Sequence, residues 1–424
     1  MQNKFSAAMR AYSVALLTLI WSANYLDRQI FAILLQSIKT EMQLSDTQLG
    51  LISGLAFSLF YVSFGLPMAY LADRFSRKRL IIVSLSLFSI MTYACGLAQN
   101  FWQLLLARMG VGVGEAGTNP ASIAMISDMY PAERRAAPMA FFALGLNIGI
   151  FAAFFFGGWL AQNYGWRATF QIVAFPGLAL AVLAAITMRE PARGMSDGRI
   201  RETRAPPVLQ VISFMFAARA MRHMTVALAL VFAVSYGAIA WIPAHLIRVH
   251  DMGTIEIGMA LAMIIGIGGG VGTAAVGVFA DRLARRDMRW NFWLLALVAT
   301  VTAPFLALAF QAETAFWALL FLLPGISLNA AYLGPALAMM QGMVRPEMRA
   351  LASAVIMFIG NLIGLGLGPL FVGIVSDIFA DSFGARSLSI GLTLLAGFSV
   401  WGGFHFMAGA RYLRADLMRP NTET

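Results

Sequence analysis

LADRFSRKR at residues 71–79 and FADRLARR at residues 279–286 are two copies of one motif, 208 positions apart. A second pair, PAERRA at 131–136 and RPEMRA at 345–350, follows at a slightly larger offset of 214. Duplication followed by small loop insertions leaves offsets that grow slowly along a chain. The sequence therefore predicts two related halves that carry the same loops between the same elements.

The composition indicates that both halves lie in a membrane. Of the 424 residues, 60% are hydrophobic and only 12% are charged, which excludes a water-soluble globule of this length. An α-helix needs about 20 mostly apolar residues to cross the hydrocarbon core of a bilayer. We expect an all-α polytopic membrane protein whose twelve transmembrane helices lie at roughly 12–36, 48–72, 80–99, 102–127, 138–161, 168–188, 223–248, 256–280, 290–310, 314–343, 350–375 and 386–412.

The placement of the basic residues predicts the topology. With the N-terminus inside, the even loops and both termini hold 24 of the 30 Lys and Arg residues, whereas the outer loops hold four. This asymmetry follows the positive-inside rule and predicts that both termini are cytoplasmic. Because the rule accounts for the net charge of +10, we expect no nucleic-acid partner.

A polar stretch rich in Arg, Pro and Gly divides the predicted spans into six and six. The sequence thus predicts an N-terminal six-helix bundle at 1–188, a cytoplasmic linker at 189–222 and a C-terminal six-helix bundle at 223–424. Parallel six-helix repeats are an architecture of secondary transporters.

The residues that usually carry catalysis are missing. The single Cys95 lies in the third span, and the chain has no P-loop, metal-binding cluster or nucleophile triad. We therefore expect neither an enzyme nor an ATP-driven pump, and no cofactor or metal. No role is predicted for the four histidines, His223, His245, His250 and His405. Four glycines of the fifth span are expected to allow close helix packing: Gly145, Gly149, Gly157 and Gly158.

The repeated loop resembles the signature of the major facilitator superfamily, Gly-x-Leu-Ala-Asp-Arg-x-Gly-Arg-Lys. It stands here as AYLADRFSRK and again as GVFADRLARR, with Ala69 and Ser76 replacing the two glycines of the first copy. The resemblance implies two pseudo-symmetric six-helix bundles, alternating access and a monomer. It also implies a cytoplasmic gate in which Arg77 pairs with Asp128. The gate residues expected here are Asp73, Arg77, Asp128, Asp281 and Arg285. A basic loop that only sets the topology is the alternative.

Three further stretches are similar to the spinster-type transporters, whose animal members export sphingosine-1-phosphate and lysophospholipids. They are NYLDR at 24–28, LSDTQLGLISGLAFSLFYVSFGLP at 44–67 and RMGVGVGEAGTNPA at 108–121. The resemblance implies that Asp27 of the first stretch and Glu115 of the third are linked to proton movement. For a bacterial member it implies the cytoplasmic (inner) membrane.

Four charged residues, Asp27, Arg28, Arg108 and Glu115, fall inside predicted spans, where a charge at the bilayer centre costs about 2.5–3.5 kcal/mol. Asp27 and Arg28 lie about 100° apart on a helix, so we expect them to have different partners. A cation favours the ionised form of a buried carboxylate, whereas burial alone favours the protonated form. We hypothesise that the two acids exchange protons while competing for the two arginines, which hold an anionic headgroup in one state. A static ion network that pins span 1 to span 4 is the alternative.

Polar residues of both halves complete the expected substrate site. Besides Arg28 and Arg108, it comprises Asn24, Thr118, Asn119, Tyr236, Trp241, Asn329, Tyr332 and Asn361. The second half lacks counterparts of the four charges and is rich in Phe and Met, so a charged wall faces an apolar one. This combination suits an amphipathic anion, although Met and aromatic residues at helical spacing also serve plain packing.

The sequence thus predicts a proton-coupled secondary transporter that works by alternating access on a lysophospholipid-like or sphingoid-phosphate-like anion. The alternatives are a proton symporter of a small organic anion such as a sugar acid, and a membrane sensor or scaffold without transport. The expected partners are the substrate, protons and membrane lipids.

Overall fold

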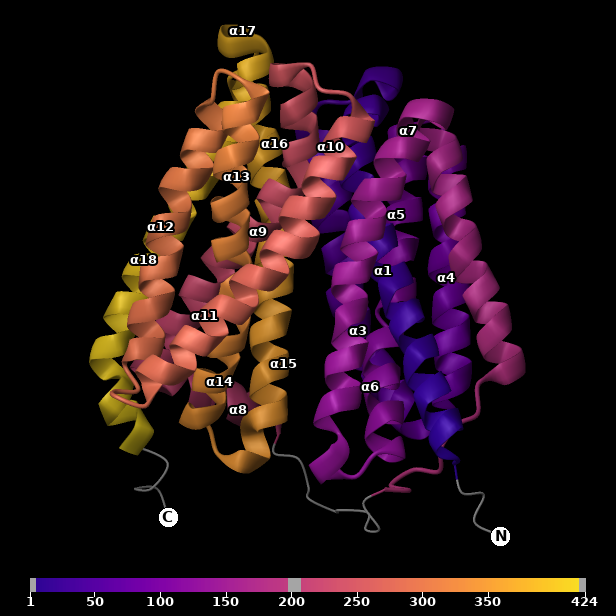
Figure 1. The fold of residues 1–424 in the computed structure, drawn as a ribbon, viewed down its shortest axis with the longest axis vertical. Coiled ribbons are helices and arrows are strands. Elements are labelled where there is room, and N and C mark those ends of the chain that lie inside the picture. Colours follow the sequence, from indigo (N-terminus) through magenta and orange to yellow (C-terminus); the bar gives the residue numbers. More distant parts are fainter. Residues whose placement is uncertain (1–4, 197–206, 419–424) are drawn as a thin grey trace. The chain divides into compact units, whose positions relative to one another are not determined.

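The computed structural model describes residues 5–196 and 207–418, and these residues form helices without any strand (Figure 1). They divide into two compact units, Met1–Leu44 with Ala56–Glu202 and Gly253–Ala262, and Ser45–Leu55 with Thr203–Met252 and Met263–Thr424. We call these the first and the second unit. Residues 197–206 of the predicted linker lie outside the described residues.

The first unit contains seven α-helices and one 3₁₀ turn. They are α1 (Ala7–Met42), α3 (Phe57–Arg74), α4 (Arg77–Leu97), α5 (Phe101–Glu115), α6 (Thr118–Met129), η2 (Ala132–Arg134), α7 (Ala136–Thr187) and α10 (Thr254–Leu261). α1 begins at the Ser6 cap, whose hydroxyl accepts a hydrogen bond from the Met9 N–H, and it ends at Gln43 in the left-handed conformation.

The second unit contains the remaining elements of the described chain. They are α2 (Asp46–Gly50), η1 (Leu51–Ala56), α8 (Val208–Ala217), α9 (Arg219–His250), η3 (Ala262–Gly268), α11 (Gly269–Ala284), α12 (Trp290–Gln311), α13 (Ala315–Asn329), η4 (Ala330–Tyr332), α14 (Leu333–Met343), η5 (Pro346–Met348), α15 (Arg349–Gly360), η6 (Asn361–Leu367), α16 (Gly368–Ile378), α17 (Ala380–Phe383), η7 (Gly384–Arg386) and α18 (Ser387–Met418). Three of these, η1, η3 and η6, are π-helical segments inside longer helices.

Nine helices among the described residues are long and apolar enough to cross a membrane. The 52-residue α7 contains both the fifth and the sixth expected span, which meet at Gly165. The first expected span coincides with α1, and the fourth is divided between α5 and α6, neither of which reaches the length of a span alone. The all-helical membrane fold is confirmed, and the count of twelve stays a prediction.

Glycines allow α1 and α7 to approach each other closely. A Cβ atom added to Gly149 would lie 2.3 Å from the Ser22 carbonyl oxygen of α1, and one added to Gly145 would lie 2.7 Å from that of Thr18. Real Cβ atoms do not approach other atoms so closely. The prediction of close packing through these glycines is confirmed, and the packing fixes the rotation of α1, which carries NYLDR.

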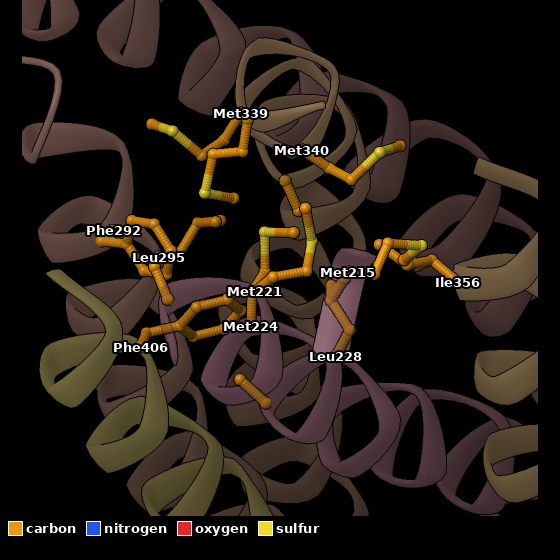
Figure 2. Close-up of a cluster of buried hydrophobic side chains, with 14 of the residues drawn as sticks. Met215, Met221, Met224, Leu228, Phe292, Leu295, Met339, Met340, Ile356 and Phe406 are labelled. Carbon is orange, nitrogen blue, oxygen red and sulfur yellow. The ribbon is translucent and has the colours of Figure 1, made fainter. Parts of the chain in front are cut away.

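A methionine-rich core holds the second unit together. Figure 2 shows Met215 of α8, Met221 and Met224 of α9, and Met339 and Met340 of α14 packed around one centre. α8 lies within the stretch predicted to be a linker, and the side chain of its residue Met215 is fully buried. The part of that stretch from Val208 to Ala217 is therefore a helix packed into the core.

The start of α2 is anchored within the second unit by a buried ion pair. The Asp46 carboxylate is 2% exposed and accepts two hydrogen bonds from Arg248 of α9, both at 2.7 Å, and one from the Ser376 hydroxyl of α16 at 2.6 Å. The Asp377 carboxylate accepts the Asp46 and Thr47 N–H groups at 3.0 and 2.8 Å. These contacts satisfy the first N–H donors of α2 and give Arg248 a defined partner.

Candidate functional site

The four charged residues predicted inside the membrane all belong to the first unit and are all buried. Asp27 and Arg28 of α1 are 2% and 7% exposed, and Arg108 and Glu115 of α5 are both 1% exposed. Arg108 and Glu115 are seven residues apart, so both lie on one face of α5. Charges are almost never buried to this degree without partners, so the contacts of each one decide its chemistry.

Arg28 pairs with Glu115. Its Nε and Nη2 atoms donate to the same oxygen, Glu115 Oε2, at 3.1 and 2.6 Å. The guanidinium carbon also lies 5.1, 5.1 and 4.6 Å from the ring centres of Tyr25, Phe57 and Tyr61. Aromatic faces stabilise a cation that has left water. The ion pair thus joins α1 to α5, with an aromatic wall contributed by α1 and α3.

Asp27 has a different partner. Its Oδ1 atom accepts a short hydrogen bond from the Thr92 hydroxyl of α4. The Thr92 oxygen also lies 2.9 Å from the Phe88 carbonyl oxygen, a second possible acceptor for the same proton. Within the described chain, Asp27 Oδ2 is buried without a hydrogen-bond partner. The prediction that Asp27 and Arg28 engage different partners is confirmed.

Arg108 is buried against aromatic rings. Its guanidinium carbon lies 4.9 Å from the centre of the Phe31 ring and 5.1 Å from that of Phe57, which Arg28 also contacts. In the described part of the molecule, Nε and Nη1 of Arg108 have no hydrogen-bond partner. A buried guanidinium normally satisfies its donors, so these two nitrogens can still donate to a further acceptor.

Neutral polar residues of α1 and α6 continue the cluster. The Thr118 hydroxyl donates to Asn24 Oδ1 at 2.5 Å, and both residues are nearly fully buried. Asn24 Nδ2 is buried without a hydrogen-bond partner in the described chain, and Asn119 is partly buried. The structure therefore brings Asn24 and Thr118 into direct contact, as expected for parts of one site.

The predicted residues of the second unit form two pairs and two separate positions. Asn329 Nδ2 donates to the Ser235 hydroxyl at 2.8 Å, and the Tyr236 hydroxyl lies 3.5 Å from Asn361 Oδ1. The other two are aromatic residues in packed positions: Tyr332, edge-on to the Phe232 ring at 5.2 Å, and Trp241, fully buried with its indole N–H donating to the Pro369 carbonyl at 2.8 Å. Trp241 thus has a complete structural role within the unit.

The expected gate pair of the first unit forms. Arg77 Nη1 contacts Asp128 Oδ2 in a short ion pair, and Asp128 Oδ1 accepts the Gly194 N–H at 2.9 Å. The Asp73 carbonyl oxygen accepts a hydrogen bond from Arg193. The other two expected gate residues, Asp281 and Arg285, are exposed near the end of α11.

Sequence reasoning missed several contacts of these charges. Thr92 was the main omission, although a hydroxyl within the apolar third span is a usable signal. The rings of Phe57 and Tyr61 also escaped notice, because aromatic residues are common in spans. Glu190, which accepts the Arg77 N–H at 2.7 Å, was assigned to the linker. Among the described residues, no group of three or more His, Cys, Asp or Glu could hold a metal ion.

With this geometry established, comparison with known proteins identifies the family. The family model described as Major Facilitator Superfamily matches residues 17–369. The chain belongs to the major facilitator superfamily. An MFS-type efflux pump of Mycolicibacterium smegmatis is 34% identical over 95% of this chain and 93% of its own. Protein spinster homolog 1 of Xenopus tropicalis is 28% identical, over 93% and 80% of the two chains.

Other relatives of this major facilitator protein indicate its subgroup. The crystal structure of a bacterial homolog of the human lysosomal transporter spinster, in an inward-facing and unoccupied conformation, matches with a TM-score of 0.89 and 28% identity, over 97% of this chain and 99% of that one. A cis,cis-muconate transport protein of Acinetobacter baylyi is 27% identical over 61% of this chain and 63% of its own. The protein is thus a spinster-like member of a transporter superfamily, and an integral, multi-pass membrane protein.

Proposed function

We propose that this protein is a proton-coupled secondary active transporter that moves an amphipathic anionic lipid, of the lysophospholipid or sphingoid-phosphate kind, by alternating access. The observation that carries the proposal is Arg108, a buried guanidinium whose Nε and Nη1 lack acceptors in the described chain. Hydrogen bonds from a guanidinium to phosphate are charge-assisted and strong, so an anionic headgroup is a fitting acceptor for either unused donor.

Arg28 supplies the second cation of the proposed headgroup site. Both guanidinium carbons lie 5.1 Å from the centre of the Phe57 ring, so the two cations flank the same side chain. Arg28 is held by Glu115 in this state. Protonation of Glu115 removes the negative charge opposite Arg28 and frees its donors for the substrate. Proton binding to Glu115 and substrate binding to Arg28 are thereby coupled.

Asp27 suits the role of a second proton carrier because its partner can serve both protonation states. When Asp27 is ionised, the Thr92 hydroxyl donates to it. When Asp27 is protonated, its own O–H can donate to the Thr92 oxygen, and the Thr92 proton can turn to the Phe88 carbonyl at 2.9 Å. Neither state leaves the hydroxyl unsatisfied, which lowers the cost of proton exchange in a buried site.

The remaining parts of the proposal follow from the family. We assign Asn24, Thr118 and Asn119 of the first unit, with the polar residues of the second, to substrate contacts. The cytoplasmic gate consists of Asp73, Arg77, Asp128, Asp281 and Arg285. The protein acts as a monomer in the bacterial inner membrane with both termini in the cytoplasm. The relative described as an efflux pump favours export.

A small organic anion is the second candidate substrate. The relative described as a cis,cis-muconate transport protein favours it, since a dicarboxylate also pairs with two guanidinium groups. The two candidates differ in the tail, because only a lipid needs an apolar surface beside the cations. The aromatic residues around Arg28 and Arg108 favour the lipid.

A substrate panel under an imposed pH gradient tests the proposal. Purified protein in proteoliposomes is given a labelled lysophospholipid, a labelled sphingoid phosphate, a hexuronate or muconate, and flux is measured with and without the gradient. We expect gradient-dependent flux of a lysolipid, and none of the sugar acid. Saturable flux of the hexuronate or muconate without lysolipid flux would assign the second function, and the absence of flux for all four would contradict transport of these anions.

A further inference from the structure

A second basic site lies in the second unit, apart from the buried charge cluster. A cavity of about 380 Å³ opens between the start of α9 and the second half of α18. Its lining residues are Arg219, Arg222, His223, Val226, His405 and Tyr412. Among the residues that the structure describes, no acidic one lines it, and the transport proposal uses none of these six residues.

One arginine and one histidine of this cavity lie against the Tyr412 ring. The Arg219 guanidinium carbon lies 5.4 Å from the Tyr412 ring centre, and the His223 ring stacks on the same tyrosine at 5.9 Å with an interplanar angle of 4°. Arg219 and Arg222 are exposed. The nearby Asp416 carboxylate accepts the Ala220 N–H at 2.6 Å and so caps the start of α9. Two exposed arginines therefore line the opening, while the nearby Asp416 carboxylate is engaged by the backbone.

The histidine pair adds a hydrogen-bond donor. His223 Nδ1 and His405 Nδ1 lie 2.9 Å apart, so one ring carries the bridging proton and the other accepts it. In the neutral pair, the accepting ring must carry its own proton on Nε2. Whichever ring accepts, the neutral pair holds one Nε2–H donor and one unprotonated Nε2, and both rings are among the lining groups.

The surface next to the cavity is apolar. Val226 in its lining is 40% exposed, and two neighbours of the His405 ring, Trp401 and Phe404, are 54% and 66% exposed. Basic residues next to an exposed aromatic and aliphatic face are typical of the boundary between lipid headgroups and acyl chains. A free phosphate ion would contact only the basic cavity, whereas a lipid would contact both the cavity and the apolar surface beside it.

We propose that this cavity binds the phosphate of an anionic membrane lipid, with Arg219, Arg222 and the histidine pair contacting the headgroup and the Val226, Trp401 and Phe404 surface contacting an acyl chain. Basic pockets between transmembrane helices on the cytoplasmic side bind anionic headgroups in this way. The ligand is a lipid of the surrounding leaflet, distinct from any transported molecule.

Native mass spectrometry of the full-length protein in a non-ionic detergent tests the site. Dioleoyl-phosphatidylglycerol is titrated against the wild type and Arg219→Gln/Arg222→Gln, with dioleoyl-phosphatidylcholine as the zwitterionic comparison. We expect the double variant to bind phosphatidylglycerol about 30-fold more weakly, at roughly one factor of five per basic residue. The matched control is Arg282→Gln/Arg286→Gln, two exposed arginines of the same unit that do not line the cavity, and we expect it to bind as the wild type does.

Further variants separate this site from its alternatives. Arg108→Gln must retain the phosphatidylglycerol site, since its loss would place the lipid in the charge cluster and overturn the proposal. Equal loss in the matched control would show unspecific charge attraction. Competition by inorganic phosphate at the same phosphate concentration would make the cavity an anion site rather than a lipid site. If the double variant does not fold, Arg222→Glu replaces it, and unchanged binding by that variant contradicts the proposal.

Discussion

Arg28 donates two hydrogen bonds to one oxygen of Glu115 and none to the other. Nε and Nη2 reach Oε2 at 3.1 and 2.6 Å, while Oε1 is buried without a hydrogen-bond partner in the described chain. A bidentate arginine-carboxylate pair would use both oxygens. This one-sided arrangement leaves one oxygen of Glu115 able to take up a proton, and it is the geometric basis of the proposed coupling.

Arg108→Gln should weaken substrate binding without destabilising the fold. Each hydrogen bond from a charged group contributes about 1.5–3 kcal/mol, so we expect the apparent affinity for the anionic substrate to fall about 10- to 100-fold. The free energy of unfolding should stay the same or rise, because the substitution removes a buried cation with unsatisfied donors.

Measurements of substrate affinity and of thermal unfolding in detergent check this prediction, which expects a lower affinity and an equal or higher stability. Arg79→Gln, which changes an exposed arginine, is the control and should alter neither quantity. A marked loss of stability in Arg108→Gln, with the affinity of the folded fraction unchanged, would instead assign Arg108 to a structural network.

Thr92→Val should impair proton coupling, since valine matches the shape of threonine but cannot hydrogen-bond to Asp27. We expect gradient-driven accumulation in proteoliposomes to fall about tenfold, the effect of losing one hydrogen bond to a charged group. Thr92→Ser keeps the hydroxyl and should retain most of the activity. Equal accumulation by the valine variant and the wild type would remove Thr92 from the account.

Asp128→Asn should destabilise the first unit. It leaves the guanidinium of Arg77, which is 8% exposed, without its ion-pair partner. Breaking a buried pair by removing one partner costs about 3–5 kcal/mol, measurable as a lower unfolding temperature. Glu133→Gln, an exposed acid near the same end of the unit, should change the temperature little. A silent Asp128→Asn variant would show that the pair contributes nothing to stability.

Asp287, in the loop between α11 and α12, should stabilise the protein at neutral pH but not in strong acid. Hydrogen bonds from the Arg289 side chain and backbone lower the pKa of Asp287 from 3.8 to about 2. A depressed pKa gives a contribution that is fully present above the unfolded value and is lost as the pH falls through the folded value, here between about pH 4 and pH 2.

The difference in unfolding temperature between wild type and Asp287→Asn, measured across pH, checks this sign. The difference should be constant from pH 5 to pH 8 and should shrink as the pH falls below about 4. A difference that grows in acid would contradict the assigned contacts.

The fold was largely predictable because the sequence patterns that indicate it extend over many residues. Apolar stretches and a duplicated loop suffice to predict helices and two related units. Two details were not predictable from apolar length. The fifth and sixth expected spans are two helical segments of α7, and the single non-helical residue Gly165, with φ of 77°, separates them without a longer loop. α8 was not predicted because prolines and arginines precede it, although Val208–Ala217 is apolar except for Gln210 and Ser213 and follows the Pro207 cap.

The sequence was enough to predict which charged residues are buried in the site, but not which partner each of them contacts. Burial of four charges follows from their positions within apolar stretches. Helical geometry separated Asp27 from Arg28, and the structure confirms that the two residues have different partners. The choice of Glu115 for Arg28 and of Thr92 for Asp27 depends on how α1, α4 and α5 are rotated against one another. That rotation is set by close packing of many residues, which one sequence does not reveal.

Proton movement during substrate transport tests the central claim most directly. Proteoliposomes with an entrapped pH indicator report proton uptake when substrate is added to wild type, Asp27→Asn and Glu115→Gln. We expect both variants to remain monodisperse, to keep substrate counterflow, and to lose proton movement at least tenfold, a barrier of about 1.4 kcal/mol or more. Folded variants that move substrate and protons with the pH dependence of the wild type would contradict the claim that these two acids carry the protons.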